Sequence, residues 1–190
     1  MRRRALAAAL AVAGLLLAGC TSDDGIAGEN TGGYISGDGS VLTVPESARA
    51  DLGAGGGDTV DGERIDSTEI DGVVVLNFWY AGCPPCRDEA GDLEEVAVEY
   101  ADRLTFLGVN IRDTAPTAAS FEEEFGVTYD SILDASTRDV LLAFAGDVPP
   151  SAVPTTLVLD ADGRVAARIA GRIPSAQTLA DIIDDVLAES

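Results

Sequence analysis

Stretches of consecutive apolar residues alternate along this chain with amphipathic segments, a pattern typical of buried strands joined by helices. The apolar runs Val73–Trp79 and Leu104–Val109 predict strands that are buried on both faces. Thr155–Leu159 and Val165–Ile169 flank a turn sequence that contains Gly163, so they predict a β-hairpin. Apolar residues at helical spacing predict four helices, at Pro85–Tyr100, Pro116–Phe125, Ser136–Phe144 and Ser175–Leu187.

The order of these elements predicts the fold class. Two strand–helix units followed by a hairpin and a last helix indicate an α/β fold, with a central mixed sheet and helices on both faces. The compact domain is expected to begin near Asp58, where the sequence DTVDGERID predicts two short strands around an Asp61-Gly62 turn. We therefore assign residues 58–190 to a single α/β domain.

The N-terminus has the features of an export signal. Three arginines, Arg2, Arg3 and Arg4, precede the apolar stretch Ala5–Ala18. This stretch is too short to cross a bilayer, and its basic flank is typical of a secretory signal. Residues 1–19 are therefore expected to form a signal peptide.

The end of this segment, Leu17-Ala18-Gly19-Cys20, resembles the lipobox of bacterial lipoproteins. The resemblance implies cleavage before Cys20 and lipidation of its sulfur, which would anchor the protein to the extracytoplasmic face of the cell membrane. An ordinary signal-peptidase site with an unmodified cysteine is the alternative. Residues 20–57 contain long stretches rich in Gly, Asp and Ser, so we expect them to form a flexible tether between the anchor and the domain.

The charge of the chain limits its partners. The sequence contains 33 acidic residues and 12 basic ones, all of them arginine. Without residues 1–19, nine arginines remain and the net charge is −24. Nucleic acid is not expected as a partner, because phosphate binding requires a basic surface. The acidity instead indicates a solvated, repulsive surface.

If Cys20 carries lipid, the C-x-x-C pair in NFWYAGCPPCRDE holds the remaining two thiols, Cys83 and Cys86. Cys83 falls where the Val73–Trp79 strand ends and the next helix begins, and the N–H groups and dipole of a helix N-terminus stabilise a thiolate. We expect Cys83 to be the accessible nucleophile and Cys86, one turn further and more shielded, to be the resolving thiol. A disulfide across two residues would stabilise the fold little, so the pair is expected to be redox-active.

The neighbours of the cysteines bear on the direction of electron transfer. Pro84 and Pro85 lack the backbone N–H groups that would stabilise a thiolate, and Asp88 and Glu89 add negative charge nearby. The helix dipole and Arg87 act in the opposite sense, and the chain has no histidine. Because a less stabilised thiolate makes the dithiol a better electron donor, we favour a reductant over an oxidant.

No metal or other cofactor is expected at this pair. Structural zinc takes four ligands, usually cysteine and histidine, and this pair supplies two thiols in a chain without histidine. A copper site lacks the imidazole ligands for the same reason.

The stretch NFWYAGCPPCRDE, followed further along the chain by VPTTLVLDADGRV, resembles the TlpA/ResA-like branch of thioredoxin-fold proteins. The resemblance runs from Asp58 to the C-terminus and implies a thioredoxin-like fold. Val153 and Pro154 match the cis-proline pair of that family, which lies beside the redox cysteines and offers backbone to an incoming peptide. The cis bond is implied by the resemblance, because the sequence alone does not separate Pro154 from the other prolines.

Four further residues are interpreted through this resemblance. Glu89 matches an active-site glutamate that assists proton transfer, although an acidic residue in the first turn of any helix is the alternative. Asn77 stands where thioredoxins carry a buried, proton-shuttling aspartate, which makes Glu89 the implied substitute. Trp79 is expected to pack in the core, and Gly82 replaces the family's usual tryptophan, which predicts a more open rim.

The resemblance implies a membrane-tethered, extracytoplasmic thiol–disulfide oxidoreductase. Its expected substrates are disulfides of exported proteins, such as the haem-binding cysteines of apocytochrome c, and its expected electron donor is a membrane thiol carrier. Three alternatives remain open: an oxidase that forms disulfides in exported proteins, a thiol peroxidase, and a non-catalytic lipoprotein in which the cysteines form an inert link.

Overall fold

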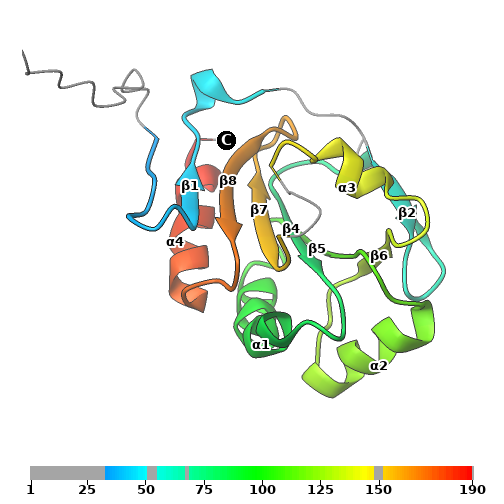
Figure 1. The fold of residues 1–190 in the computed structure, drawn as a ribbon. Coiled ribbons are helices and arrows are strands. Elements are labelled where there is room, and N and C mark those ends of the chain that lie inside the picture. Colours follow the sequence, from blue (N-terminus) through cyan, green and yellow to red (C-terminus); the bar gives the residue numbers. More distant parts are fainter. Residues whose placement is uncertain (1–32, 51–54, 67–68, 148–151, 190) are drawn as a thin grey trace, which may run out of the picture. The chain divides into compact units, whose positions relative to one another are not determined.

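A computed structural model describes residues 33–50, 55–66, 69–147 and 152–189 (Figure 1). The expected signal peptide, residues 1–19, and the expected lipidation site, Cys20, lie outside the described residues. Within the described ranges, no helix is both long enough and apolar enough to cross a membrane.

A six-stranded mixed sheet forms the centre of the domain (Figure 1). Strands β4, β5 and β6 run parallel to one another, and β1, β8 and β7 continue the sheet by antiparallel pairing on the other side of β4. In spatial order the strands are β1 (Val41–Thr43), β8 (Val165–Ala170), β7 (Thr155–Leu159), β4 (Val74–Trp79), β5 (Thr105–Asn110) and β6 (Ser131–Leu133). The predicted mixed sheet is therefore confirmed.

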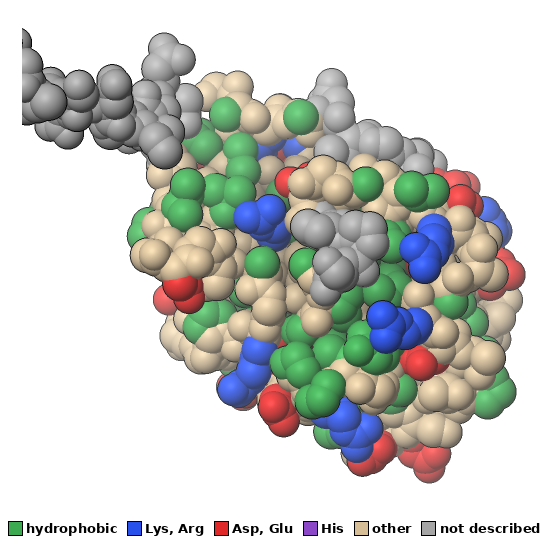
Figure 2. Space-filling model, viewed as in Figure 1, with side chains coloured by type: hydrophobic (Ala, Val, Ile, Leu, Met, Phe, Trp, Pro, Cys, Tyr) green, Lys and Arg blue, Asp and Glu red, His purple; other side chains and the backbone are tan. Residues whose placement is uncertain are grey.

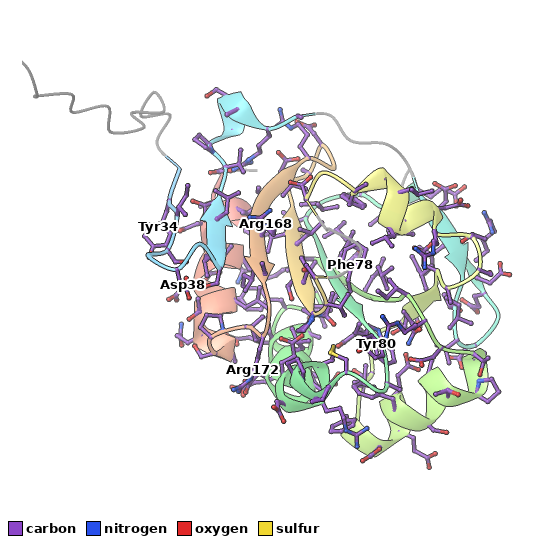
Figure 3. All side chains as sticks on the ribbon, in the orientation of Figure 1. Tyr34, Asp38, Phe78, Tyr80, Arg168 and Arg172 are labelled. Atoms are coloured by element: carbon purple, nitrogen blue, oxygen red, sulfur yellow. A yellow bond between two sulfur atoms is a disulfide. The ribbon has the colours of Figure 1, made fainter. Side chains whose placement is uncertain are left out.

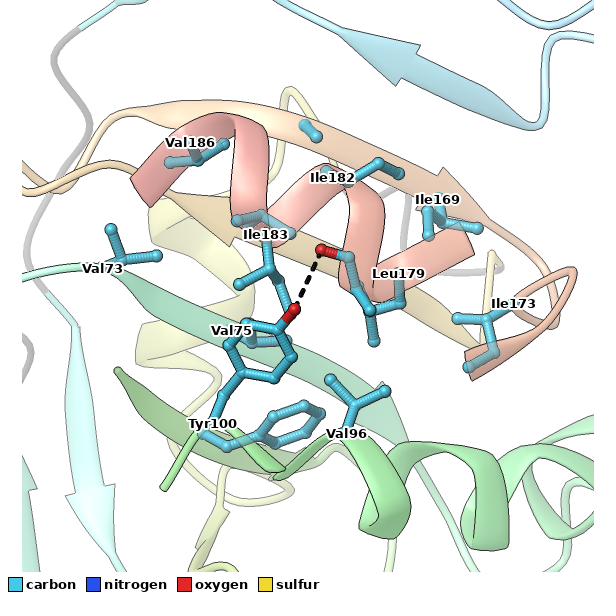
Figure 4. Close-up of a cluster of buried hydrophobic side chains, with 14 of the residues drawn as sticks. Val73, Val75, Val96, Tyr100, Ile169, Ile173, Leu179, Ile182, Ile183 and Val186 are labelled. Carbon is cyan, nitrogen blue, oxygen red and sulfur yellow. Dashed lines mark hydrogen bonds between the residues drawn. The ribbon is translucent and has the colours of Figure 1, made fainter. Parts of the chain in front are cut away.

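Helices cover both faces of this sheet, as the sequence predicts. They are α1 (Pro84–Glu99), α2 (Ala115–Phe125), α3 (Asp139–Ala143) and α4 (Ala176–Leu187). Helices α1 and α4 share one hydrophobic cluster with the sheet, in which the hydroxyl of Tyr100 donates to the carbonyl of Ala180 at 3.3 Å (Figure 4). Helix α3 contributes to a second cluster with other strand side chains, and α2 packs against α1 through a third.

Local chemistry explains where the helices begin and end. Helix α2 ends at Gly126, which adopts the left-handed conformation (φ 69°) that favours glycine. Helix α3 begins at Asp139, later than the predicted Ser136. The reason is the buried Asp134 carboxylate, which accepts the N–H groups of Val140 and Leu141 at 3.1 and 2.9 Å and so replaces the partners missing at a helix N-terminus.

Part of the segment before Asp58 is folded, whereas a flexible tether was expected there. Strand β1 pairs in register with β8, from Val41 opposite Ile169 to Thr43 opposite Ala167. A second sheet pairs β2 (Gly56–Asp58) with β3 (Arg64–Asp66). The β2–β3 hairpin was predicted, but the domain includes sheet residues well before Asp58. Strand β1 escaped prediction because a three-residue strand carries no periodicity; by pairing with β8 it covers an edge that would otherwise be open.

Arg49 fixes this early segment to the domain. Its side chain is 3% exposed and lies 3.1 Å from the Asp160 carboxylate and 2.6 Å from that of Glu189. The Arg49 Nε also donates to the Val44 carbonyl at 2.9 Å. A buried cation with three partners stabilises the docked segment only while all of them stay paired.

We predict that Arg49→Ala lowers the free energy of unfolding by about 3 kcal/mol, the lower end for breaking a buried ion pair. The lower end applies because Asp160 keeps Arg164 as a partner at 3.0 Å. Urea unfolding measures the change. The control is Arg64→Ala, because Arg64 is 65% exposed and pairs with an exposed Asp58; we expect a change below about 1 kcal/mol there. Equal losses in the two variants would contradict the buried role of Arg49.

Candidate active site

The two cysteines lie where strand β4 passes into helix α1, and they are joined by a disulfide. The connecting turn is held at two points. The N–H of Ala81 donates to the Asp113 carboxylate at 2.6 Å, and the N–H of Cys83 donates to the Tyr80 carbonyl at 3.1 Å. The predicted position of Cys83 at the helix N-terminus is therefore confirmed.

Cys83 is the N-cap residue of α1, and its sulfur accepts the N–H of Cys86 at 3.3 Å. Pro84 and Pro85 fill the first two helical positions, so neither supplies an N–H group. An N-cap side chain ordinarily bonds to the second or third helical N–H. One of these two donors is thus present, at Cys86, and the other is missing, at Pro85.

Both cysteines are buried in the disulfide form, Cys83 to 1% and Cys86 to 2% exposure. The expectation of an accessible Cys83 is wrong for this form. Tyr80, Ala81 and Val153 pack against the cluster that contains the pair. They are only half-buried themselves, so the cluster that contains Cys83 borders partly exposed side chains.

The Val153–Pro154 peptide bond is cis, as the family resemblance implies. The carbonyl oxygen of Val153 lies 3.9 Å from the Cys83 sulfur, which places this pair directly beside the disulfide. The Pro154 carbonyl is already bonded, since it accepts the N–H of Gly171 at 2.8 Å. Val153 is therefore the residue of the pair whose backbone faces the cysteines.

Glu89 is fully buried, with no exposed surface. Its carboxylate accepts the Asn77 side-chain N–H at 3.0 Å and the Ile173 backbone N–H at 2.8 Å. Burial raises the pKa of the Glu89 carboxyl from its usual value of 4.5 to about 7, and these two hydrogen bonds limit the rise. A buried carboxyl of this kind does not fit the alternative of an ordinary acidic residue on the surface of a first helical turn.

Asn77 connects this carboxyl to the sheet. Its amide nitrogen donates to Glu89 and also to the Thr156 hydroxyl, at 3.1 Å, on the neighbouring strand. Glu89 follows Cys86 at a spacing that places both side chains on one side of the helix. The structure thus pairs the Glu89 carboxyl with Asn77, and Asn77 and Cys86 line the same small cavity.

Trp79 packs in the core, as predicted, with its ring centroid 4.4 Å from that of Phe121. It belongs to the same hydrophobic cluster as the two cysteines. A small cavity of about 10 Å³ is lined by Cys86, Trp79, Asn77 and Tyr129 among others. This is close to the smallest space that holds one water.

Two groups beside the site were not predicted from the sequence. Asp113 fixes the turn before Cys83 and also accepts the Asn110 amide at 2.9 Å. The Arg112 guanidinium lies over the Tyr80 ring, 4.2 Å from its centroid. An Asn110–Asp113 spacing at the end of a buried strand is a weak signal for a turn-fixing pair. The Arg112–Tyr80 contact has no local signal because it joins two different strand ends.

Comparison with known proteins places the domain in a family. The model of the AhpC/TSA family matches residues 49–168. A DsbF homologue from Corynebacterium diphtheriae is 34% identical, with a TM-score of 0.71 over 80% of this chain and 96% of that one. A secreted thiol-disulfide isomerase from Corynebacterium glutamicum is 31% identical, with a TM-score of 0.73 over 83% and 99%. The fold is therefore thioredoxin-like.

Curated relatives agree with this assignment. The thiol-disulfide oxidoreductase ResA of Halalkalibacterium halodurans is 28% identical over 108 residues, which is 56% of this chain and 58% of that protein. Across such relatives the chain spans 51% to 63% of their length.

We predict that Glu89 makes stability depend on pH. The folded carboxyl has its pKa raised from 4.5 to about 7, so the folded state binds the proton more tightly than the unfolded state. The stabilisation is complete below pH 4.5 and is lost as the pH rises through about 7. Its size is about 3 kcal/mol at most. Glu89→Gln removes the titrating group. The free energy of unfolding of this variant, measured with urea, should therefore not show this decrease as the pH rises.

The control for this measurement is Glu95→Gln, an exposed position on the same helix. It should follow the wild-type pH profile. Parallel profiles for wild type and Glu89→Gln would contradict the assignment of the titration to Glu89.

Proposed function

We propose that this chain, which belongs to the AhpC/TSA family, works outside the cytoplasm as a thiol–disulfide oxidoreductase of the ResA and DsbE type. The observation that carries the proposal is the Cys83–Cys86 disulfide at the N-terminus of α1, beside the cis bond of Val153–Pro154. A helix N-terminus stabilises the thiolate that attacks a disulfide. The family relationship supports the same chemistry, since several relatives carry that activity in their names.

In the proposed reaction the reduced protein donates two electrons. The Cys83 thiolate attacks one sulfur of the substrate disulfide, and the other substrate sulfur leaves as a thiolate and takes up a proton. The deprotonated Cys86 then attacks the Cys83 sulfur of the mixed disulfide, so the second substrate sulfur leaves in turn. The substrate ends as a dithiol and the protein ends with the Cys83–Cys86 disulfide, which the electron donor must reduce again.

Glu89 is assigned as the group that accepts the Cys86 proton. A carboxyl with a pKa of about 7 is close to the ideal value for a proton acceptor near neutral pH. Asn77 cannot take this role because an amide does not titrate, but its hydrogen bond holds the carboxylate in place at 3.0 Å.

Substrate is expected to bind along Val153. Its carbonyl already lies 3.9 Å from the Cys83 sulfur, so a peptide that pairs with this backbone places its own sulfur near Cys83. Cys83 is buried in the disulfide form, so neighbouring groups are expected to shift when the substrate sulfur approaches.

We further propose that exported proteins are the substrates, with apocytochrome c as a candidate, and that a membrane thiol carrier supplies the electrons. The relatives named ResA, DsbE homolog and HelX support this class. Export by residues 1–19 and lipid attachment at Cys20 would place the domain beside such a carrier. The lipid anchor is tested by incorporation of radiolabelled fatty acid. We expect the wild-type protein to be labelled and the Cys20→Ser variant to remain unlabelled.

We predict that Cys86→Ser traps a mixed disulfide with substrate, because the nucleophile remains and the resolving thiol is gone. Cys83→Ser should trap none. Both variants are made with Cys20→Ser so that no other thiol competes. Mass spectrometry of the reduced protein mixed with a disulfide-closed peptide detects the adduct. Trapping by Cys83→Ser alone would reverse the two roles, and trapping by neither would favour a non-catalytic disulfide.

We predict a reduction potential nearer to thioredoxin, about −270 mV, than to the strong oxidant DsbA, about −120 mV. Pro85→Ala restores the missing second helical N–H, which stabilises the Cys83 thiolate and should raise the potential by about 30 mV or more. Pro84→Ala is the matched control, because the first helical N–H does not reach an N-cap side chain. Equilibration with glutathione measures all three.

A wild-type reduction potential of about −120 mV would contradict the reductase and support a disulfide-forming oxidase. Consumption of hydrogen peroxide by the reduced protein would favour a thiol peroxidase instead.

A further inference from the structure

The arginines of this acidic chain are mostly paired with carboxylates. Among the described residues, six of the nine arginines form ion pairs. The three without a carboxylate within salt-bridge distance are Arg112, Arg138 and Arg168. These three lack an acidic partner among the described residues although the chain contains 33 acidic residues. Figure 2 shows basic side chains around a hydrophobic area on this face, with most acidic ones towards its outline.

Arginine–aromatic contacts separate Arg112 from the rest. Three arginines of the described residues lie over an aromatic ring: Arg87 over Phe125 at 4.7 Å, Arg103 over Tyr100 at 5.0 Å and Arg112 over Tyr80 at 4.2 Å. The first two also hold a carboxylate, that of Glu124 at 2.6 Å and that of Asp184 at 3.2 Å. Arg112 has the shortest ring contact and lacks the carboxylate.

The carboxylate nearest in sequence to Arg112 is committed elsewhere. Asp113 accepts the Ala81 N–H at 2.6 Å and the Asn110 amide at 2.9 Å, so it fixes the turn and does not pair with the guanidinium. The exposed Arg112 side chain therefore keeps its hydrogen-bond donors free for another molecule.

This guanidinium is held at the rim of the redox site. Tyr80, over which it lies, accepts the Cys83 N–H through its carbonyl at 3.1 Å, and it packs against the cluster that contains both cysteines. Figure 3 labels Tyr80 near the start of α1 and Arg168 further away on β8. Stacking on the ring restricts the guanidinium, so less side-chain freedom is lost when an anion binds.

We propose that Arg112 binds a carboxylate of the substrate polypeptide, an aspartate or glutamate side chain close to the cysteine that Cys83 attacks. The proposal rests on the proposed function and specifies its substrate class, disulfide-containing polypeptides with an acidic residue beside the reactive cysteine. A planar guanidinium matches a carboxylate with two parallel hydrogen bonds. It also offsets locally the repulsion between an acidic partner and this acidic chain.

The test uses the reduced, full-length protein and three peptides, each closed by one internal disulfide. The peptides differ only in the residue that follows the second cysteine, which is Glu, Gln or Lys. Stopped-flow fluorescence of Trp79, the single tryptophan, follows the oxidation of the protein, because Trp79 lies in the cluster of the two cysteines. The measured quantity is the ratio of second-order rate constants for the Glu and Gln peptides.

For wild type at low salt we expect the Glu peptide to react about two- to fivefold faster than the Gln peptide, the range for an exposed ion pair. The Lys peptide should be the slowest. Arg112→Gln should bring the Glu-to-Gln ratio to about one. In 1 M salt the wild-type ratio should also fall towards one, since the screening length shrinks to about 3 Å.

Arg103→Gln is the matched control, because Arg103 also stacks on a tyrosine but lies beyond the opposite end of α1. It should keep the wild-type ratio. A wild-type ratio of one, or an equal ratio in wild type and Arg112→Gln, overturns the carboxylate site while leaving the oxidoreductase intact. A uniform slowing of all three peptides by Arg112→Gln would show a positioning role and also overturns it. Failure of wild type to reduce any peptide overturns the proposed function and this site together.

Discussion

The sulfur atom of Cys83 caps the N-terminus of helix α1, and the candidate site depends on that arrangement. The Cys83 Sγ accepts the N–H of Cys86 at 3.3 Å, so the hydrogen bond that caps the helix also joins the two residues of the redox pair. A cap of this kind stabilises a helix by about 1 kcal/mol when the acceptor is oxygen. The same contact stabilises a thiolate when the disulfide is open. Folding of α1 and reactivity of the pair are therefore not independent properties of this chain.

A second constraint lies behind the cysteines. Glu89 joins three parts of the fold, because Asn77 belongs to β4, Glu89 to α1, and Ile173 to the turn that precedes α4. Burying a carboxylate is unfavourable, and the two hydrogen bonds offset only part of the cost, which is why its pKa is raised to about 7. An apolar residue in this position would avoid the cost of burying the charge but would leave the Ile173 N–H without this partner. A titrating carboxyl in this position is consistent with the proposed role of Glu89 as a proton acceptor.

The elements that could be predicted from the sequence are those with a long hydrophobic pattern or a recognisable chemical motif. The all-buried strand β4, the amphipathic α4 and the C-x-x-C pair each stand out alone. Strands β1 and β6 have three residues each, too few for any period to appear. Pro154 was identified by family resemblance, since a sequence does not mark a cis bond. The burial of Cys83 and the Arg112–Tyr80 contact escaped because both depend on residues that meet only after folding.

The effect of the acidic residues on a charged partner differs between long range and contact distance. Over distances beyond about 10 Å, salt screens the net charge, so the many carboxylates repel an acidic partner only weakly. At contact distance the Arg112 guanidinium has no carboxylate partner among the described residues, because the Asp113 carboxylate accepts the Ala81 N–H instead. The turn that positions Cys83 therefore also keeps Arg112 free of its neighbouring acid. Geometry at the end of β5 thus couples the position of Cys83 to the charge that lies near it.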